Sequence, residues 1–146
     1  MVIGFGVVAT LQLLAAGTVS NAAGNELTTA VQLANNVREI SLGLAFYDPQ
    51  SPTQWVSREA TVAAYDNLLD LDGQAFDPPL NGARTPIASM ATWAQKVDVQ
   101  PVSETNYATA VPRTTSVRTA RVTVTIEHNK KVVYQTAWIA CAPNAD

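Results

Sequence analysis

The N-terminal part of the chain changes from apolar on every side to apolar on one side. Within residues 1–19 the polar side chains are Thr10, Gln12 and Thr18. A helix of this length spans roughly 28 Å, about the hydrocarbon core of a bilayer. From residue 25 onward, apolar residues recur every three or four positions, which is typical of an amphipathic helix. The pattern predicts one helix of about 45 residues, which Asp48-Pro49 ends.

Strict alternation near the C-terminus predicts an antiparallel sheet. Residues 118–127 alternate, residues 128–130 form the expected turn, and residues 132–140 return. We expect Val132, Tyr134, Thr136 and Trp138 on one face of the returning strand. Residues 92–100 are the expected third strand. The last two runs therefore predict a β-hairpin that an earlier strand extends.

The middle of the chain gives weaker patterns. Residues 48–53 are expected to be a loop, and a short helix is expected around residues 59–69. Residues 71–87 combine glycines and prolines, so we expect an extended loop with no regular element there.

The fold class that these patterns predict is α+β, with a long N-terminal α-helix packed on a small C-terminal antiparallel sheet of three to four strands. We divide the chain into an apolar helix half, residues 1–24, and a soluble domain, residues 25–146. The predicted helix-to-sheet core consists of Leu27, Val31, Ala34, Val37, Leu44, Val122, Val124, Ile126 and Trp138.

Composition narrows the function classes. Charged residues make up 14% of the 146 residues, against roughly 25% in a typical soluble domain. The formal net charge is −3 and there is no basic stripe, so we expect no nucleic-acid partner. Cys141 is the only cysteine, which excludes an internal disulfide, and its apolar neighbours suggest a small buried side chain.

The opening stretch contains Gly4-Phe5-Gly6-Val7-Val8-Ala9, the spacing of a dinucleotide-binding loop. Such a loop needs a buried strand before it, and only three residues precede Gly4. A secretory signal peptide is a second alternative, but no Lys or Arg precedes the apolar run, and Asn21 disfavours a cleavage site nearby. A plain membrane anchor stays open beside the helical interpretation.

The sequence contains few side chains that suit a catalytic site. His128 is the only histidine and falls in the expected hairpin turn, where we expect a solvated side chain. An acidic loop offers weak calcium candidates: Asp66, Asp70, Asp72 and Asp77. Their spacing is not that of an EF-hand, and a solvated acidic loop is the plainer interpretation. We predict no enzyme activity and no cofactor, with Ca²⁺ as the one candidate ligand.

Several stretches together resemble type IV pilins and type II secretion pseudopilins. Two segments of the predicted helix, VIGFGVVATLQLLAAG and NELTTAVQLANNVRE, are similar in sequence to the helix of minor, prepilin-like members. The loop YDNLLDLDGQAFDPPLNG, the strand TWAQKVDVQPV and the hairpin RVTVTIEHNKKVVYQTAWIA follow in the order that this family shows. The resemblance covers nearly the whole chain.

The resemblance implies a structural subunit, of the minor type, of a type IV pilus or a type II secretion pseudopilus. Its partners would be other subunits, the membrane and the filament assembly machinery. The implied location is the bacterial cytoplasmic membrane, single-pass, with the C-terminal domain outside, and the periplasm or exterior once in a filament. The implied membrane and filament-core residues are Val2, Ile3, Phe5, Val7, Val8, Leu11, Leu13 and Leu14. The alternative is a membrane-anchored or exported small binding domain that forms no filament.

The family's signature is a short basic leader that ends in glycine, followed by a phenylalanine-type residue and a glutamate. These features do not occur in residues 1–19, so we expect them upstream of Met1. Glu26 lies beyond the apolar run and is not the signature glutamate.

Overall fold

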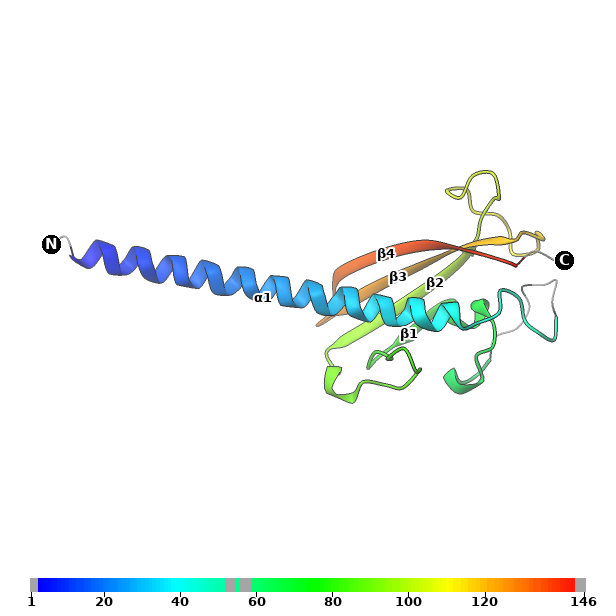
Figure 1. The fold of residues 1–146 in the computed structure, drawn as a ribbon, viewed down its shortest axis with the longest axis horizontal. Helices are drawn as coiled ribbons and strands as arrows, with labels where there is room; N and C mark the ends of the chain where they lie inside the picture. The colour runs from blue at the N-terminus through cyan, green and yellow to red at the C-terminus, as the bar shows by residue number, and fades with distance from the viewer. Residues whose placement is uncertain (1–2, 52–54, 56–58, 144–146) are drawn as a thin grey trace.

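One long helix and a four-stranded antiparallel sheet form the computed structural model. It describes residues 3–51, 55 and 59–143, with residues 3–19 described as helix backbone alone. Helix α1 spans Ile3–Leu42, 40 residues, and is therefore about 60 Å long. Its C-terminal half lies along the sheet, and its N-terminal half projects beyond the sheet (Figure 1).

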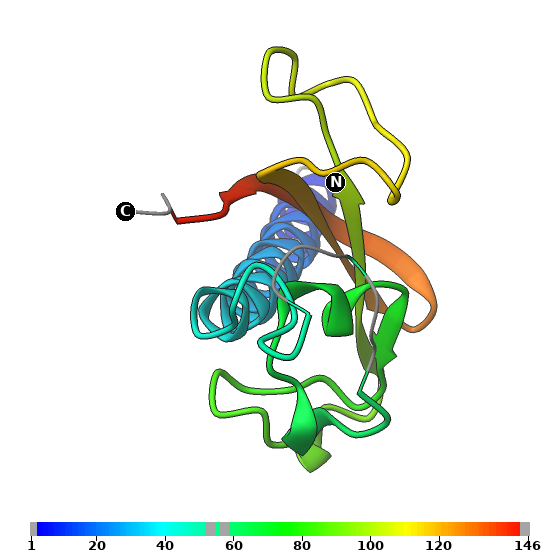
Figure 2. The same ribbon diagram turned by 90° about the vertical axis from the view of Figure 1, so that its right-hand side faces the viewer.

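The sheet confirms the predicted α+β class and contains four strands in the order β1-β2-β3-β4. These are β1, Gln74–Phe76; β2, Trp93–Pro101; β3, Thr119–His128; and β4, Lys131–Cys141. All neighbouring strands are antiparallel, so the sheet is a simple meander. In Figure 2, α1 is seen end-on against one face of the sheet.

Strand β1 corrects the expectation of an extended loop without regular structure over residues 71–87. Gln74 lies opposite Val97, and Phe76 lies opposite Gln95. A strand of three residues fits between Gly73 and Pro78 because an edge strand needs only one of its sides paired. The expected helix around residues 59–69 is replaced by two short 3₁₀ turns, Val62–Ala64 and Leu68–Leu71.

The predicted hairpin is present, with a tighter turn than expected. Asn129 and Lys130 have φ values of 50° and 64°, the left-handed conformations that a two-residue hairpin loop requires. His128 is therefore the last residue of β3 and not part of the turn.

A register shift near this turn changes the face of one predicted residue. Tyr134 lies opposite Ile126, whereas Val132 lies opposite Glu127, so β4 carries one extra residue in between. The bulge turns Val132 to the outer face, where its exposed fraction is 63%. The expectation that Val132 shares a face with Tyr134 is therefore wrong.

The core lies between the C-terminal half of α1 and the inner face of the sheet. Of the expected core residues, these are buried: Ala34, Val37, Val122, Val124 and Ile126. Val31, Leu44 and Trp138 are half-buried. Leu27 does not belong to the core, because its exposed fraction is 47% and full burial on α1 begins at Ala30.

A buried glutamine joins three elements of this core. Gln95 on β2 donates from Nε2 to the Leu33 carbonyl of α1 at 2.9 Å and to the Leu80 carbonyl at 3.0 Å. Its Oε1 accepts the Leu80 N–H at 2.7 Å. The side chain is fully buried, and these bonds satisfy both ends of its amide.

Within the part of the chain that the structure describes, no helix combines the length and the apolar composition needed to cross a bilayer. The described side chains of α1 begin at Ser20 and include Asn25, Glu26, Arg38 and Glu39. Among the described side chains, residues 20–42, these groups leave no apolar run of spanning length. The expected transmembrane helix and the expected single-pass location in the cytoplasmic membrane are therefore wrong.

Candidate functional site: a groove beside strand β4

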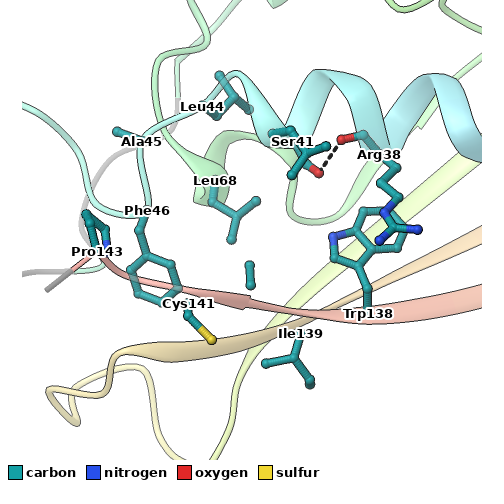
Figure 3. A pocket seen from close by; sticks show the side chains of 12 residues that line it. Arg38, Ser41, Leu44, Ala45, Phe46, Leu68, Trp138, Ile139, Cys141 and Pro143 are labelled. Atoms are coloured by element: carbon teal, nitrogen blue, oxygen red, sulfur yellow. Dashed lines mark hydrogen bonds between the residues drawn. The ribbon is translucent and has the colours of Figure 1, made fainter.

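A groove of about 410 Å³ opens between the C-terminal end of α1 and strand β4. Figure 3 shows side chains from both elements facing this space. Its lining comes from three parts of the chain: Arg38, Ser41 and Leu42 of α1; the connecting residues Leu44, Ala45, Phe46 and Leu68; and Trp138 to Cys141 with Pro143. Most of these side chains are apolar, and Arg38 is the one charged group among them.

Arg38 marks one end of the groove. Its guanidinium carbon lies 5.9 Å from the centre of the Trp138 ring, a cation–π distance. Ser41 Oγ donates to the Arg38 carbonyl at 2.7 Å, so this hydroxyl is held against its own helix. Among the described residues, no carboxylate forms an ion pair with Arg38. The groove therefore offers apolar walls and one cation without an acidic partner there.

Aromatic side chains stiffen the chain just after α1. Phe46 contacts Tyr47 and Trp55 edge-to-face, with ring centres 4.8 Å and 5.1 Å apart. Tyr47 Oη donates to the Val117 carbonyl at 2.5 Å. Burial raises the pKa of the Tyr47 phenol; the Arg118 charge lowers it and the Glu104 charge raises it, each less than burial does. These contacts fix Phe46, which forms one wall of the groove.

Two of the four calcium candidates, Asp70 and Asp72, are buried and hydrogen-bonded within the fold. Asp70 is fully buried, and its carboxylate accepts the N–H groups of Glu59, Asp66 and Asn67 at 2.9, 3.0 and 3.1 Å. Asp70 and Asn67 form a capping box on the 3₁₀ turn Leu68–Leu71. The carboxylate therefore organises backbone.

Asp72 is also buried and lies between the 3₁₀ turn Leu68–Leu71 and strand β1. Its Oδ2 accepts from Arg113 at 2.6 Å, and its Oδ1 accepts the Val99 N–H at 2.9 Å. Asp66 is half-buried and Asp77 is exposed. Over the described residues, no three His, Cys, Asp or Glu side chains come together as metal ligands. The expectation of a solvated acidic loop is wrong for Asp70 and Asp72.

His128 lies against α1 and not in solvent as expected. Its Nδ1 is 2.5 Å from Glu26 Oε1, and its ring stacks on Trp93 with centres 4.2 Å apart. Cys141 is exposed, contrary to the expected burial, because its side chain belongs to the last residue of β4. The two residues lie at opposite ends of the β3–β4 hairpin, so they form no catalytic pair.

The predicted filament-core residues add no contacts to this description. Val2 lies outside the described residues, and side chains are not described at the seven other positions: Ile3, Phe5, Val7, Val8, Leu11, Leu13 and Leu14.

Sequence reasoning did not find the groove. Arg38 sits on the polar side of an amphipathic helix pattern, and Trp138 belongs to an alternating strand, so neither had a distinctive signal. Arg38 and Trp138 form a site only because the fold brings them together. The sequence matches no protein-family model, and no curated protein or solved structure matches it.

Proposed function

We propose that the chain is a structural subunit, of minor type, in a filament of the type IV pilus or type II secretion pseudopilus kind. The single observation that carries the proposal is the projection of α1. Its C-terminal half packs on the sheet, while its N-terminal half extends past the sheet, with no other element of the described residues beside it (Figure 1).

The composition of the projecting half explains why it should assemble. Residues 3–19 contain no charged side chain and are rich in Val, Leu and Ala. Burying apolar area against a neighbour gains about 25 cal/mol per Å² removed from water. Small residues such as Gly4, Gly6 and Ala9 allow helices to approach closely. Copies that pack these halves side by side would form a helical filament core, with the sheet domains outside it.

The same arrangement makes catalysis unnecessary to the function. The partners are other subunits of the filament and the machinery that assembles them. A second candidate is an exported small binding domain that forms no filament, and the groove beside β4 is the observation that favours it.

The test is assembly of the purified full chain, followed by sedimentation and electron microscopy as the concentration rises. Val8→Glu places a charge in the projecting half and should abolish filaments while leaving the thermal unfolding of the sheet domain unchanged. Val132→Glu is the matched control, because Val132 is an exposed apolar residue of the sheet domain and lies outside residues 3–19. Filaments that form equally well with Val8→Glu refute helix-driven assembly. A chain that stays monomeric at every concentration favours the binding domain.

A further inference from the structure

The outer edge of β4 carries unpaired backbone groups. Ala142 N–H donates to the Arg118 carbonyl at 2.8 Å, which makes residues 118 and 142 a hydrogen-bonded pair. The β3–β4 register is constant from there to Ile126, and such pairs alternate in an antiparallel ladder. The backbone groups directed away from β3 therefore belong to Gln135, Ala137, Ile139 and Cys141. In the described part of the chain, no other backbone group bonds to them.

This edge lacks the usual protection of an edge strand. Natural sheets protect their edges with short strands, prolines, charges or bulges. The opposite edge follows that rule, because β1 has three residues and Pro78-Pro79 follow it closely. Strand β4 has 11 residues, no proline, and no charge from Val132 to Cys141. Its bulge lies near the turn, so residues 134–141 stay regular.

The groove adjoins the same edge. Trp138 to Cys141 belong both to the open stretch of β4 and to the groove lining (Figure 3). A strand added beside β4 would send alternate side chains toward this inner side. Those side chains would meet Phe46, Trp138 and the Arg38 cation, which has no ion-pair partner among the described residues.

We propose that β4 binds an extended segment of a partner protein by β-strand addition. The segment has apolar side chains at alternate positions, which enter the groove, and a carboxylate that pairs with Arg38. The proposal does not depend on filament assembly, since it concerns the opposite end of α1.

A second copy of β4 suits this edge less well. Two copies of β4 that pair antiparallel through residues 135, 137, 139 and 141 are related by a two-fold axis at residue 138. Arg38 lies over Trp138, so the two Arg38 side chains would approach each other across that axis. Like charges at such a position oppose pairing. The Arg38 charge instead favours an acidic segment.

The experiment uses the full chain and a blocked eight-residue peptide that alternates valine and threonine, with glutamate in place of the last valine. Amide hydrogen exchange is followed by NMR. In the free chain, the amides of residues 135, 137, 139 and 141 should exchange much faster than those of residues 134, 136, 138 and 140. Saturating peptide should slow the exchange of the first set.

Variants distinguish the contribution of the β4 edge to peptide binding from the contribution of the groove. Ala137→Pro removes an outward N–H and should abolish binding, whereas Ala137→Thr keeps the N–H and should bind. Arg38→Gln should weaken binding about fivefold, as the loss of one partly exposed ion pair does. A peptide N-methylated at alternate amides tests the same hydrogen bonds if Ala137→Pro fails to fold.

Three results would overturn the proposal. The first is the absence of protection at the four amides with saturating peptide. The second is equal binding of the peptide and its N-methylated form, which assigns binding to the groove alone. The third is protection of the four amides in the chain alone as its concentration rises, which makes a second copy the occupant. Loss of filaments in Val8→Glu would affect none of these measurements.

Discussion

Replacing Gln95 by methionine tests how the helix, the sheet and the loop before β2 are held together. Methionine has nearly the same length and volume, so the substitution removes hydrogen bonds with little cavity formation. The Leu80 N–H, which bonds to Gln95 Oε1 at 2.7 Å, would be left buried without that acceptor. The Leu33 and Leu80 carbonyls would each lose one donor.

The magnitude follows from these three bonds. An orphaned buried N–H costs about 1–3 kcal/mol, and each lost bond to a carbonyl with another donor costs less, about 0.5–1 kcal/mol. Leu80 O keeps Asn36 Nδ2 at 3.3 Å as a second donor. Part of this lost free energy is recovered, because the apolar methionine side chain is favourable in an apolar core. We therefore expect the free energy of unfolding to fall by about 2–3 kcal/mol.

Urea unfolding followed by tryptophan fluorescence measures the effect, with the m-value required to stay unchanged. Gln135→Met is the matched control, because Gln135 is exposed and bonds only to the Thr125 hydroxyl at 2.8 Å, so it should change stability by less than about 0.5 kcal/mol. A loss below about 0.5 kcal/mol in Gln95→Met would falsify the view that Gln95 is an essential polar link in the core.

Three further outcomes follow from contacts elsewhere. Asp70→Asn replaces one acceptor oxygen with a donor facing backbone N–H groups, so unfolding should need about 3 kcal/mol less, as measured in urea; an unchanged midpoint contradicts the capping role. The raised pKa of the Tyr47 phenol means that its contribution to stability is complete below about pH 10 and is lost as the pH rises through the folded-state pKa. Urea midpoints should therefore fall less steeply above that pH in Tyr47→Phe, and equal slopes refute the assignment. Glu26→Gln weakens the contact with His128, so stability should change by at most about 1 kcal/mol while the fluorescence of the stacked Trp93 changes; an unaltered spectrum contradicts the contact.

The strongly periodic parts of the fold could be predicted from sequence. Residues 119–128 alternate so regularly that one face had to be buried, and Val122, Val124 and Ile126 are fully buried. The amphipathic half of α1 followed from the same reasoning. Strand β1 could not be found, because three residues beside prolines carry no periodicity of their own. Its pairing depends on β2, which lies some twenty residues further on.

Single residues were misplaced where a local irregularity or the end of an element decides the environment. The β-bulge places Val132 on the opposite face from the one expected, and no residue in the sequence predicts this bulge. Leu27 continues the apolar stripe of α1, yet it lies where the helix leaves the sheet. From the sequence, Asp70 and Asp72 were expected in a solvated loop. Their burial could not be predicted, because tertiary structure brings the backbone N–H groups that they bind into place.

The continuity of α1 fixes the rotational phase of its projecting half. Each helical residue advances the axis by 1.5 Å and turns it by about 100°. The sheet domain holds α1 through Ala30, Leu33 and Gln95, and no break in the helix occurs before Leu42. A single residue inserted between Glu26 and Ala30 would therefore leave the core intact and rotate everything N-terminal to it by about a quarter of a turn. The orientation of the sheet domain therefore determines which side of the projecting helix a neighbour contacts.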